Sequence, residues 1–277
     1  MYLQKWRIGI DLSLNKIQLV AAKKQRDRWY LCECWQQDLP ATIFNEITPI
    51  ILQNILTKWR QKLPKSCDVR LAFPLLRTIK HQFVLSEHIS TKEPEFSWYI
   101  QSQTKKQFPM NADELIFDYQ IIAQNVYLSG ARKSDIIFWS DLLKICGFDL
   151  TTIDIAPNAL RYAAQYAGIP DDSWLIYYRD NEWLWAGPTR QPGCYNYAVT
   201  AEVPTFSQLI DQLPTDSSTN TLPIYYIGDK CIGDKCEPAA SQHWQLHQAF
   251  YQLATKLPHQ LGDFVIAAGL TLRPEDK

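Results

Sequence analysis

The fold class is decided near the start of the chain by the stretch Ile8-Gly9-Ile10-Asp11-Leu12-Ser13-Leu14-Asn15-Lys16-Ile17-Gln18-Leu19-Val20. Residues 7–11 have the pattern of a strand end. Apolar and polar residues alternate along 16–23, which is typical of a second strand, and 28–35 make a third. The chain is therefore expected to open with a three-stranded meander.

Beyond this meander, helical and extended patterns alternate along the chain. A helical stripe covers 43–59, and Pro49 inside it predicts either a kink or a late helix start. A strand at 68–73 is followed by a strand–helix–strand–strand run that ends near Gly130. The remaining pattern predicts strands at 149–155, 174–178, 182–185 and 222–227, and helices at 134–146, 158–167, 204–213, 243–257 and 264–272. This alternation indicates an α/β protein that divides near residue 170.

The composition narrows the class of protein. Hydrophobic residues make up 46% of the 277 residues and charged residues 21%, which excludes a disordered chain. A net charge of −1 argues against a general attraction to nucleic acid or to anionic lipid. Seven scattered cysteines fit free thiols in a reducing compartment. The first residues lack the apolar core of a signal peptide, and no run reaches the roughly 18 apolar residues of a spanning helix. We therefore expect a cytoplasmic protein that reaches a membrane only through a partner.

Three further blocks follow the opening stretch along the chain. They are Phe108-Pro109 with Phe117-Asp118-Tyr119-Gln120; Gly130-Ala131-Arg132-Lys133 with Leu142-Leu143, Cys146-Gly147 and Thr152-Ile153-Asp154-Ile155; and Phe264-Val265-Ile266-Ala267-Ala268-Gly269-Leu270-Thr271-Leu272-Arg273. Each block is weak alone. In this order, across nearly the whole chain, the four blocks resemble the PilM/HofM family of pilus and DNA-utilisation proteins.

The resemblance implies an actin-like (RNase H-like) α/β fold with two lobes and a small inserted β-α-β-β subdomain. It divides the chain into the first part of lobe 1 (1–76), the inserted subdomain (77–148), the return of lobe 1 (149–170) and a reduced lobe 2 (171–277). It implies a cytoplasmic scaffold, peripheral to the inner membrane, of a type IV pilus-like or competence DNA-uptake machine. The partner would be an inner-membrane PilN/HofN-like protein, bound by its N-terminal cytoplasmic tail. The short chain resembles the HofM branch more than PilM itself.

The resemblance also implies a nucleotide site, with ATP and Mg²⁺ as possible cofactors. Its residues would be Asp11, Ser13 and Asn15 on the first hairpin and Gly228 on the adenosine side. Such sites use backbone N–H groups and glycines that let a phosphate approach. Several family positions are changed, however, because relatives carry glycine at Ser13, lysine at Gln18 and an Asp-Ile-Gly-type turn around Arg179-Asp180. We therefore expect a degenerate site that needs no cofactor, and a structural aspartate of a hairpin turn is preferred to a metal-side ligand as the role of Asp11.

An intact insert beside altered phosphate motifs favours a docking module over an enzyme. Aromatic and aliphatic residues of the insert would form or support a groove for an extended apolar tail, and some of them are expected to be core: Phe83, Leu85, Trp98, Phe108, Phe117 and Tyr119. Two alternatives stay open. One is a working Mg-ATP-dependent ATPase or nucleotide switch that uses Asp11. The other, direct DNA binding, is disfavoured by the near-neutral charge.

Other patterns have simpler explanations. Cys231 and Cys236 could bind a metal with His243 or His247, but their spacing is unusual, so loop thiols are preferred. The two histidines lie four residues apart on the expected helix at 243–257 and fit a surface pair, so no metal site is assigned. Trp183 and Trp185 share one strand face, as core or as an exposed partner patch, and core is preferred.

Overall fold

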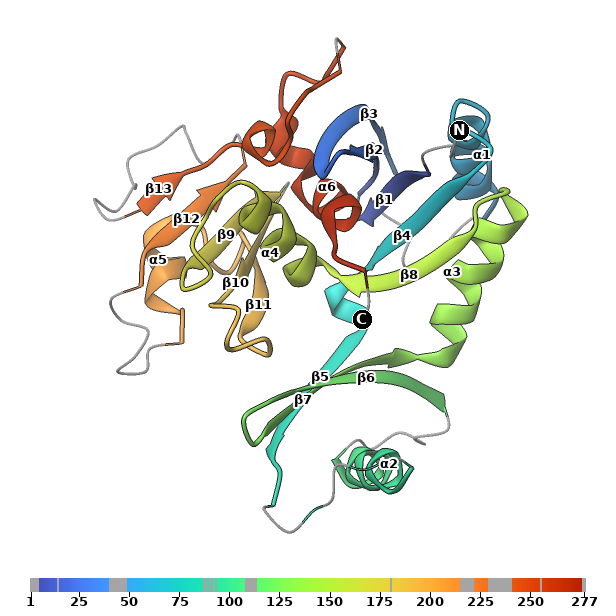
Figure 1. Ribbon diagram of the computed structural model, residues 1–277. Helices are drawn as coiled ribbons and strands as arrows, with labels where there is room; N and C mark the ends of the chain where they lie inside the picture. The colour runs from blue at the N-terminus through green and yellow to red at the C-terminus, as the bar shows by residue number, and fades with distance from the viewer. Residues whose placement is uncertain are drawn as a thin grey trace.

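The computed structural model describes residues 5–13, 15–39, 49–86, 89, 92, 94–107, 114–179, 181–214, 222–228, 241–254 and 256–275 (Figure 1). A five-stranded sheet opens the chain, in the order β3-β2-β1-β4-β8. The first three strands are antiparallel neighbours, whereas β4 and β8 run parallel to β1. Their bounds are β1 (Trp6–Leu12), β2 (Lys16–Gln25), β3 (Arg28–Asp38), β4 (Cys67–Phe73) and β8 (Leu150–Ile155). The predicted opening meander is confirmed.

A second five-stranded sheet repeats this arrangement in the order β11-β10-β9-β12-β13. Again the first three strands form an antiparallel meander, and the last two run parallel to the first. Their bounds are β9 (Trp174–Arg179), β10 (Glu182–Ala186), β11 (Tyr195–Val199), β12 (Ile224–Ile227) and β13 (Ser241–His243). Because order and direction are the same in both sheets, the molecule consists of two lobes of one architecture.

A small subdomain is inserted between β4 and β8 of the first sheet. After a short 3-10 turn, η1 (Leu75–Arg77), come β5 (Thr78–Val84), α2 (Glu95–Gln107), β6 (Leu115–Ile122) and β7 (Asn125–Arg132). The strands form a separate sheet in the order β5-β7-β6. One face of this sheet packs against Phe96 and Ile100 of α2, and the chain then returns to β8 through α3 (Lys133–Ile145). The β-α-β-β insert predicted from the sequence is confirmed.

The helices enclose three main apolar layers. α1 (Pro49–Arg60) and α3 cover the outer face of the first sheet, with Leu52 and Leu143 fully buried there. α5 (Phe206–Asp211) covers the outer face of the second sheet. α4 (Ala156–Tyr166) and α6 (Val265–Leu272) lie against each other between the two lobes (Figure 1). The last helix of the second half packs on β1, β2 and β4, so each lobe depends on the other for its core.

Two glycines permit this central packing. A Cβ atom on Gly269 of α6 would lie 1.8 Å from the carbonyl oxygen of Ala159 in α4. A Cβ atom on Gly9 of β1 would lie 1.9 Å from the carbonyl oxygen of Ala267. Because such separations are far below van der Waals contact, only glycine fits at either place. The Ala-x-Gly motif of the terminal helix is therefore a packing motif.

The structure bears on three local expectations. α1 begins at Pro49, which agrees with the late helix start. The helix expected over 243–257 is wrong: a 3-10 turn, η4 (Leu246–Ala249), follows β13, and the next residues are extended. The backbone N–H of Tyr251 donates to Trp29 of β3, and Leu31 donates to Gln252, so hydrogen bonds between segments replace those of a helix. Trp183 and Trp185 are both buried, as preferred.

Among the described residues, no helix is long and apolar enough to cross a membrane.

Candidate functional site

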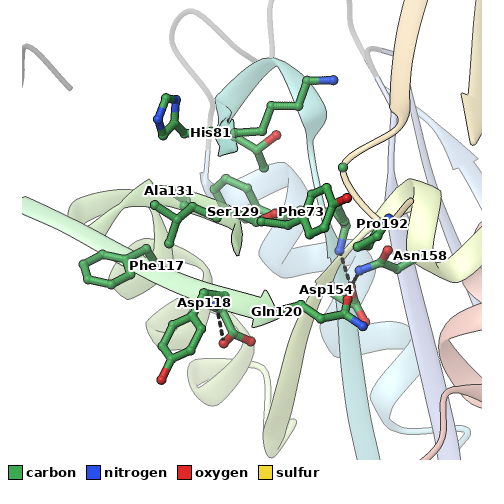
Figure 2. Close-up of a pocket in the computed structure, with 18 of the residues that line it drawn as sticks. Phe73, His81, Phe117, Asp118, Gln120, Ser129, Ala131, Asp154, Asn158 and Pro192 are labelled. Carbon is green, nitrogen blue, oxygen red and sulfur yellow. Dashed lines mark hydrogen bonds between the residues drawn. The ribbon is translucent and has the colours of Figure 1, made fainter. Parts of the chain in front are cut away.

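A cavity of about 590 Å³ lies where the insert, the first lobe and the second lobe meet. One wall is the face of the insert sheet that points away from α2. The other is formed by the start of α4 and by the loop between β10 and β11, at residues 187–194. Figure 2 shows Asn158 and Pro192 on the side opposite Phe117 and Asp118. We call this cavity the docking cleft.

The cleft-facing side of the insert sheet is largely polar. Strand pairing places Ser129 of β7 between Lys80 of β5 and Asp118 of β6, and Tyr127 lies in the same way between Gln82 and Gln120. Because side chains alternate across a strand, these residues share one face while the apolar ones between them point to α2. The insert therefore presents charged and amide groups to the cleft above a buried apolar layer.

The opposite wall is held in place by Arg161 of α4. Its guanidinium donates to the carbonyl oxygens of Gly187, Pro192 and Cys194, each at 3.1 Å. Arg161 is buried, and this burial lowers its pKa to about 10. Since one rigid cation binds several carbonyls of one loop, Arg161 fixes the shape of that loop.

This loop and the strand after it touch the insert directly. Lys80 donates its Nζ hydrogen to the carbonyl oxygen of Tyr195, and the same nitrogen lies 4.5 Å from the Tyr195 ring centroid. The hydroxyls of Ser129 and Tyr195 are 3.5 Å apart. A Cβ atom on Gly193 would lie 2.7 Å from the Tyr127 ring, so glycine is needed for this approach. Burial lowers the pKa of Lys80 and raises that of Tyr195.

The residues predicted for a groove lie mainly on the side of the insert sheet that faces α2. Phe117 and Tyr119 border the cleft, but their side chains pack against the apolar cluster of Phe96 and Ile100 under α2. Phe83 and Leu85 pack in the apolar layer beneath α2, and Trp98 lies on that helix with 63% of its surface exposed. Phe108 lies outside the described residues. The groove assignment stays a prediction.

Sequence reasoning missed the polar face of the insert sheet and the loop of the second lobe. The period-two pattern along 115–122 was a usable signal for the first, because Asp118 and Gln120 alternate with Phe117, Tyr119 and Ile121. Nothing in the sequence placed the distant residues 187–195 against them.

The nucleotide-site residues predicted on the first hairpin lie around the end of β1. Asp11 is buried, with 2% of its surface exposed, and its Oδ2 lies 2.9 Å from Nη1 of Arg179. The backbone N–H of Ser13 donates to the carbonyl oxygen of Lys16 at 2.9 Å, which closes the hairpin. The Ser13 hydroxyl lies 3.5 Å from Oδ1 of Asn15, whose residue is exposed. This hairpin is thus closed largely by its own polar groups.

Gly228, the residue predicted on the adenosine side, follows β12. Its φ of +119° is open to glycine alone among common residues, and a Cβ atom there would lie 2.4 Å from the carbonyl oxygen of Tyr178. The glycine therefore has a backbone reason to be present. It lies beside the end of β9, where Arg179 contacts Asp11.

No metal site is found within the described ranges, where no three His, Cys, Asp or Glu side chains gather as ligands. Cys231 and Cys236 lie outside the described residues. The expected helix pair of His243 and His247 is wrong, because His243 ends β13 and His247 lies in η4.

With this geometry in hand, comparison with known proteins gives the family. The model of the family described as type IV pilus assembly protein PilM matches residues 9–173. The chain belongs to the PilM family. That match covers most of the first sheet, the insert and α4, and it contains the first three of the four sequence blocks that carry the resemblance, so the resemblance to the family is confirmed. The short HofM branch stays a prediction. A search of curated protein sequences finds no significant match.

Solved structures agree with the PilM family fold. A structure of the PilM–PilN type IV pilus biogenesis complex matches with a TM-score of 0.71 at 13% identity, covering 98% of each chain. The cytoplasmic domain of EpsL, an inner-membrane component of the type II secretion system of Vibrio cholerae, matches with a TM-score of 0.61 at 12% identity, covering 88% of this chain and 92% of that one. Together with the repeated strand order, these likenesses confirm the actin-like fold.

Proposed function

We propose that this chain is a cytoplasmic scaffold that holds the N-terminal cytoplasmic tail of an inner-membrane PilN/HofN-like protein in the docking cleft. The machine it serves would be a type IV pilus-like apparatus, in the branch used for competence and DNA uptake. The observation that carries the proposal is the cleft itself, which three parts of the molecule build together. The resemblance to a PilM–PilN complex supports a partner of the PilN type.

The cleft suits an extended peptide. Its volume of about 590 Å³ falls within the usual range of ligand sites, about 300–1,000 Å³. β6 forms an edge of the insert sheet, so a tail could add as a further strand, with main-chain hydrogen bonds for affinity. The side chains of Ile116, Asp118 and Gln120, at every second position of β6, point to the cleft side of the sheet. They would contact every second residue of the tail.

The charges of the cleft favour a tail with both polar and apolar residues. Lys80 of β5 and Asp118 of β6 face the cavity from either side of β7, while Phe73 and Ile153 line it from the first lobe. An apolar anchor residue of the tail would contact Phe73 and Ile153, and polar residues on either side of it would contact Lys80 and Asp118. Membrane association would then come through the partner, and no nucleic acid would be bound directly.

The first test is calorimetric titration of the full chain with a synthetic peptide. The peptide spans the residues ahead of the membrane helix of a PilN-like protein from the same organism. The proposal predicts saturable binding that is the same with and without Mg-ATP. Absence of binding in both conditions would remove the docking function for that partner.

A matched pair of variants locates the binding site. Ile116→Asp places a charge in the cleft on a residue that is 44% exposed, so folding should survive. Ile145→Asp makes the same change on α3 at a residue that is 67% exposed and does not line the cleft. We expect tenfold or greater weakening for the first, about 1.4 kcal/mol, and wild-type affinity for the second. Equal affinity of both variants would place the peptide elsewhere.

The same titration separates the enzyme alternative. A nucleotide switch predicts that binding appears only with Mg-ATP and is lost in Asp11→Ala. The burial of Asp11 against Arg179 favours the nucleotide-independent outcome.

A further inference from the structure

An ion pair between Asp11 and Arg179 joins the first hairpins of the two lobes. Asp11 lies one residue before the end of β1, and Arg179 is the last residue of β9, the strand that occupies the same position in the second sheet. Nη1 of Arg179 is 2.9 Å from Oδ2 of Asp11. The side chain of Asp11 is 2% exposed and that of Arg179 is 10% exposed. The two equivalent strands, β1 and β9, therefore carry opposite charges at or next to their last residue, and these charges are buried against each other.

The guanidinium of Arg179 serves a second carboxylate as well. Its Nε donates to Oε1 of Glu182, which lies directly across the β9–β10 pair. Burial lowers the pKa of Arg179, but Asp11 and Glu182 outweigh it, so the pKa is raised and the guanidinium stays charged. Burial raises the pKa of Asp11, and the charge of Arg179 opposes this rise. One buried cation thus holds a carboxylate from each lobe.

The residues at this place do not fit a Mg-nucleotide, which the fold family implies between the two hairpins. A metal would need a carboxylate oxygen of Asp11 that now accepts from Arg179. Only residues 180 and 181 connect β9 to β10, and the carbonyl oxygen of Asn181 accepts the backbone N–H of Thr200 at 2.8 Å. On the other hairpin, the N–H of Ser13 is used by Lys16. The turn residues 13–15 and 180–181 include no glycine, whereas a phosphate is cradled by the backbone N–H groups of glycine-containing turns.

We propose that Arg179 is an internal cation at the position where the fold would hold the metal and phosphates of a nucleotide, and that it fastens the two lobes in one arrangement. A nucleotide can switch two lobes between open and closed arrangements because it binds and dissociates. The guanidinium of Arg179 is covalently part of β9 and cannot dissociate, so this chain keeps its lobes together without a ligand. The inference does not depend on the docking proposal, since it concerns the β1–β2 and β9–β10 hairpins and not the cleft.

The test is thermal unfolding of the full chain with ATP and Mg²⁺ added separately and together. For the wild type, we expect no change in melting temperature with any addition. A rise with Mg-ATP that disappears in Asp11→Asn would overturn the proposal, because it would show that Arg179 yields its place to the nucleotide.

A double-mutant cycle measures the link between the lobes. Arg179→Met leaves two buried carboxylates without their cation, and we expect its melting temperature to fall by about 6–15 °C. Asp11→Asn should lower it far less, because Arg179 keeps Glu182. The double variant should melt no lower than Arg179→Met, since removing Asp11 removes one stranded charge. Additive losses would contradict the proposal. If Arg179→Met does not fold, the cycle is measured with Arg179→Lys in its place, and the nucleotide test on wild type and Asp11→Asn still decides whether a nucleotide can displace Arg179.

Discussion

The two five-stranded sheets share strand order and direction but differ in the length of their turns. In the first lobe, β1 and β2 are joined by three residues, 13–15, and β2 and β3 by only Arg26 and Asp27. In the second lobe the lengths are reversed: residues 180 and 181 join β9 to β10, whereas 187–194 join β10 to β11. One architecture therefore carries two different sets of connections.

This difference teaches where function can change without loss of the fold. Arg179, the last residue before the short turn after β9, contacts Asp11, and the long loop after β10 forms one wall of the docking cleft. Neither change alters the buried strands that set the sheet order. Because turns carry few core side chains, their functional residues can be substituted with little effect on the packing of the strands beneath them.

Comparing the lobes assumes that they share one central core. Gly269→Ala tests this assumption, and it is the variant with the largest expected effect on stability. The new Cβ would lie 1.8 Å from the carbonyl oxygen of Ala159, so α4 and α6 must separate. We expect a loss of more than about 3 kcal/mol in the free energy of unfolding, measured by urea denaturation.

Gly168→Ala is the matched control for that variant. Gly168 has a φ of +82° after α4, but a Cβ atom there meets nothing within 4 Å. Only the backbone conformation opposes the change, so the loss should be about 1 kcal/mol. Equal losses for the two variants would show that the central packing is looser than these distances imply.

The long loop of the second lobe is tested by Arg161→Met, with an intermediate effect. The variant strands the carbonyl oxygens that Arg161 binds, and we expect a loss of about 2–4 kcal/mol together with weaker peptide binding. Arg190→Met serves as control, because Arg190 belongs to the same loop and pairs with Asp172 in an exposed ion pair. That control should change stability by under about 1 kcal/mol. Unchanged peptide affinity in a folded Arg161→Met would remove the loop from the cleft.

The short turn of the first lobe gives the smallest effect. Arg26 and Asp27 have φ values of 47° and 63°, a left-handed pair that suits a two-residue hairpin turn. Arg26→Asn should stabilise the protein by about 0.5 kcal/mol because asparagine tolerates this conformation better. Arg26→Val should destabilise it by about 1 kcal/mol. A shift of the same sign in both variants would contradict the turn assignment.

Most of the fold could be predicted from the sequence, because periodic burial leaves a local record. The opening meander, the insert and the terminal helix follow from alternation and helical stripes. The segment at 243–257 could not be predicted in this way. Its buried Leu246, Ala249 and Phe250 have the spacing of a helix face, but its backbone bonds to β3, more than two hundred residues earlier.

The candidate sites were predicted only in part. The sequence marked Asp11 and Gly228 and showed Arg179 where relatives have an aspartate–glycine turn. It could not show that Arg179 reaches Asp11, since the two residues belong to different lobes. For the insert, hydrophobicity selected Phe83 and Leu85, which pack under α2, because composition does not tell a core aromatic from one at a cleft.

By itself, then, the sequence determined the succession of most helices and strands along an α/β chain, its insert and its family, since these depend on patterns within short segments. The tertiary structure alone decided which distant residues meet: Arg179 with Asp11, the Arg161-bound loop with the insert, and Gly269 with Ala159. The physical reason is that such contacts depend on how complete elements pack, and packing depends on shape and burial across the whole chain rather than on any local period.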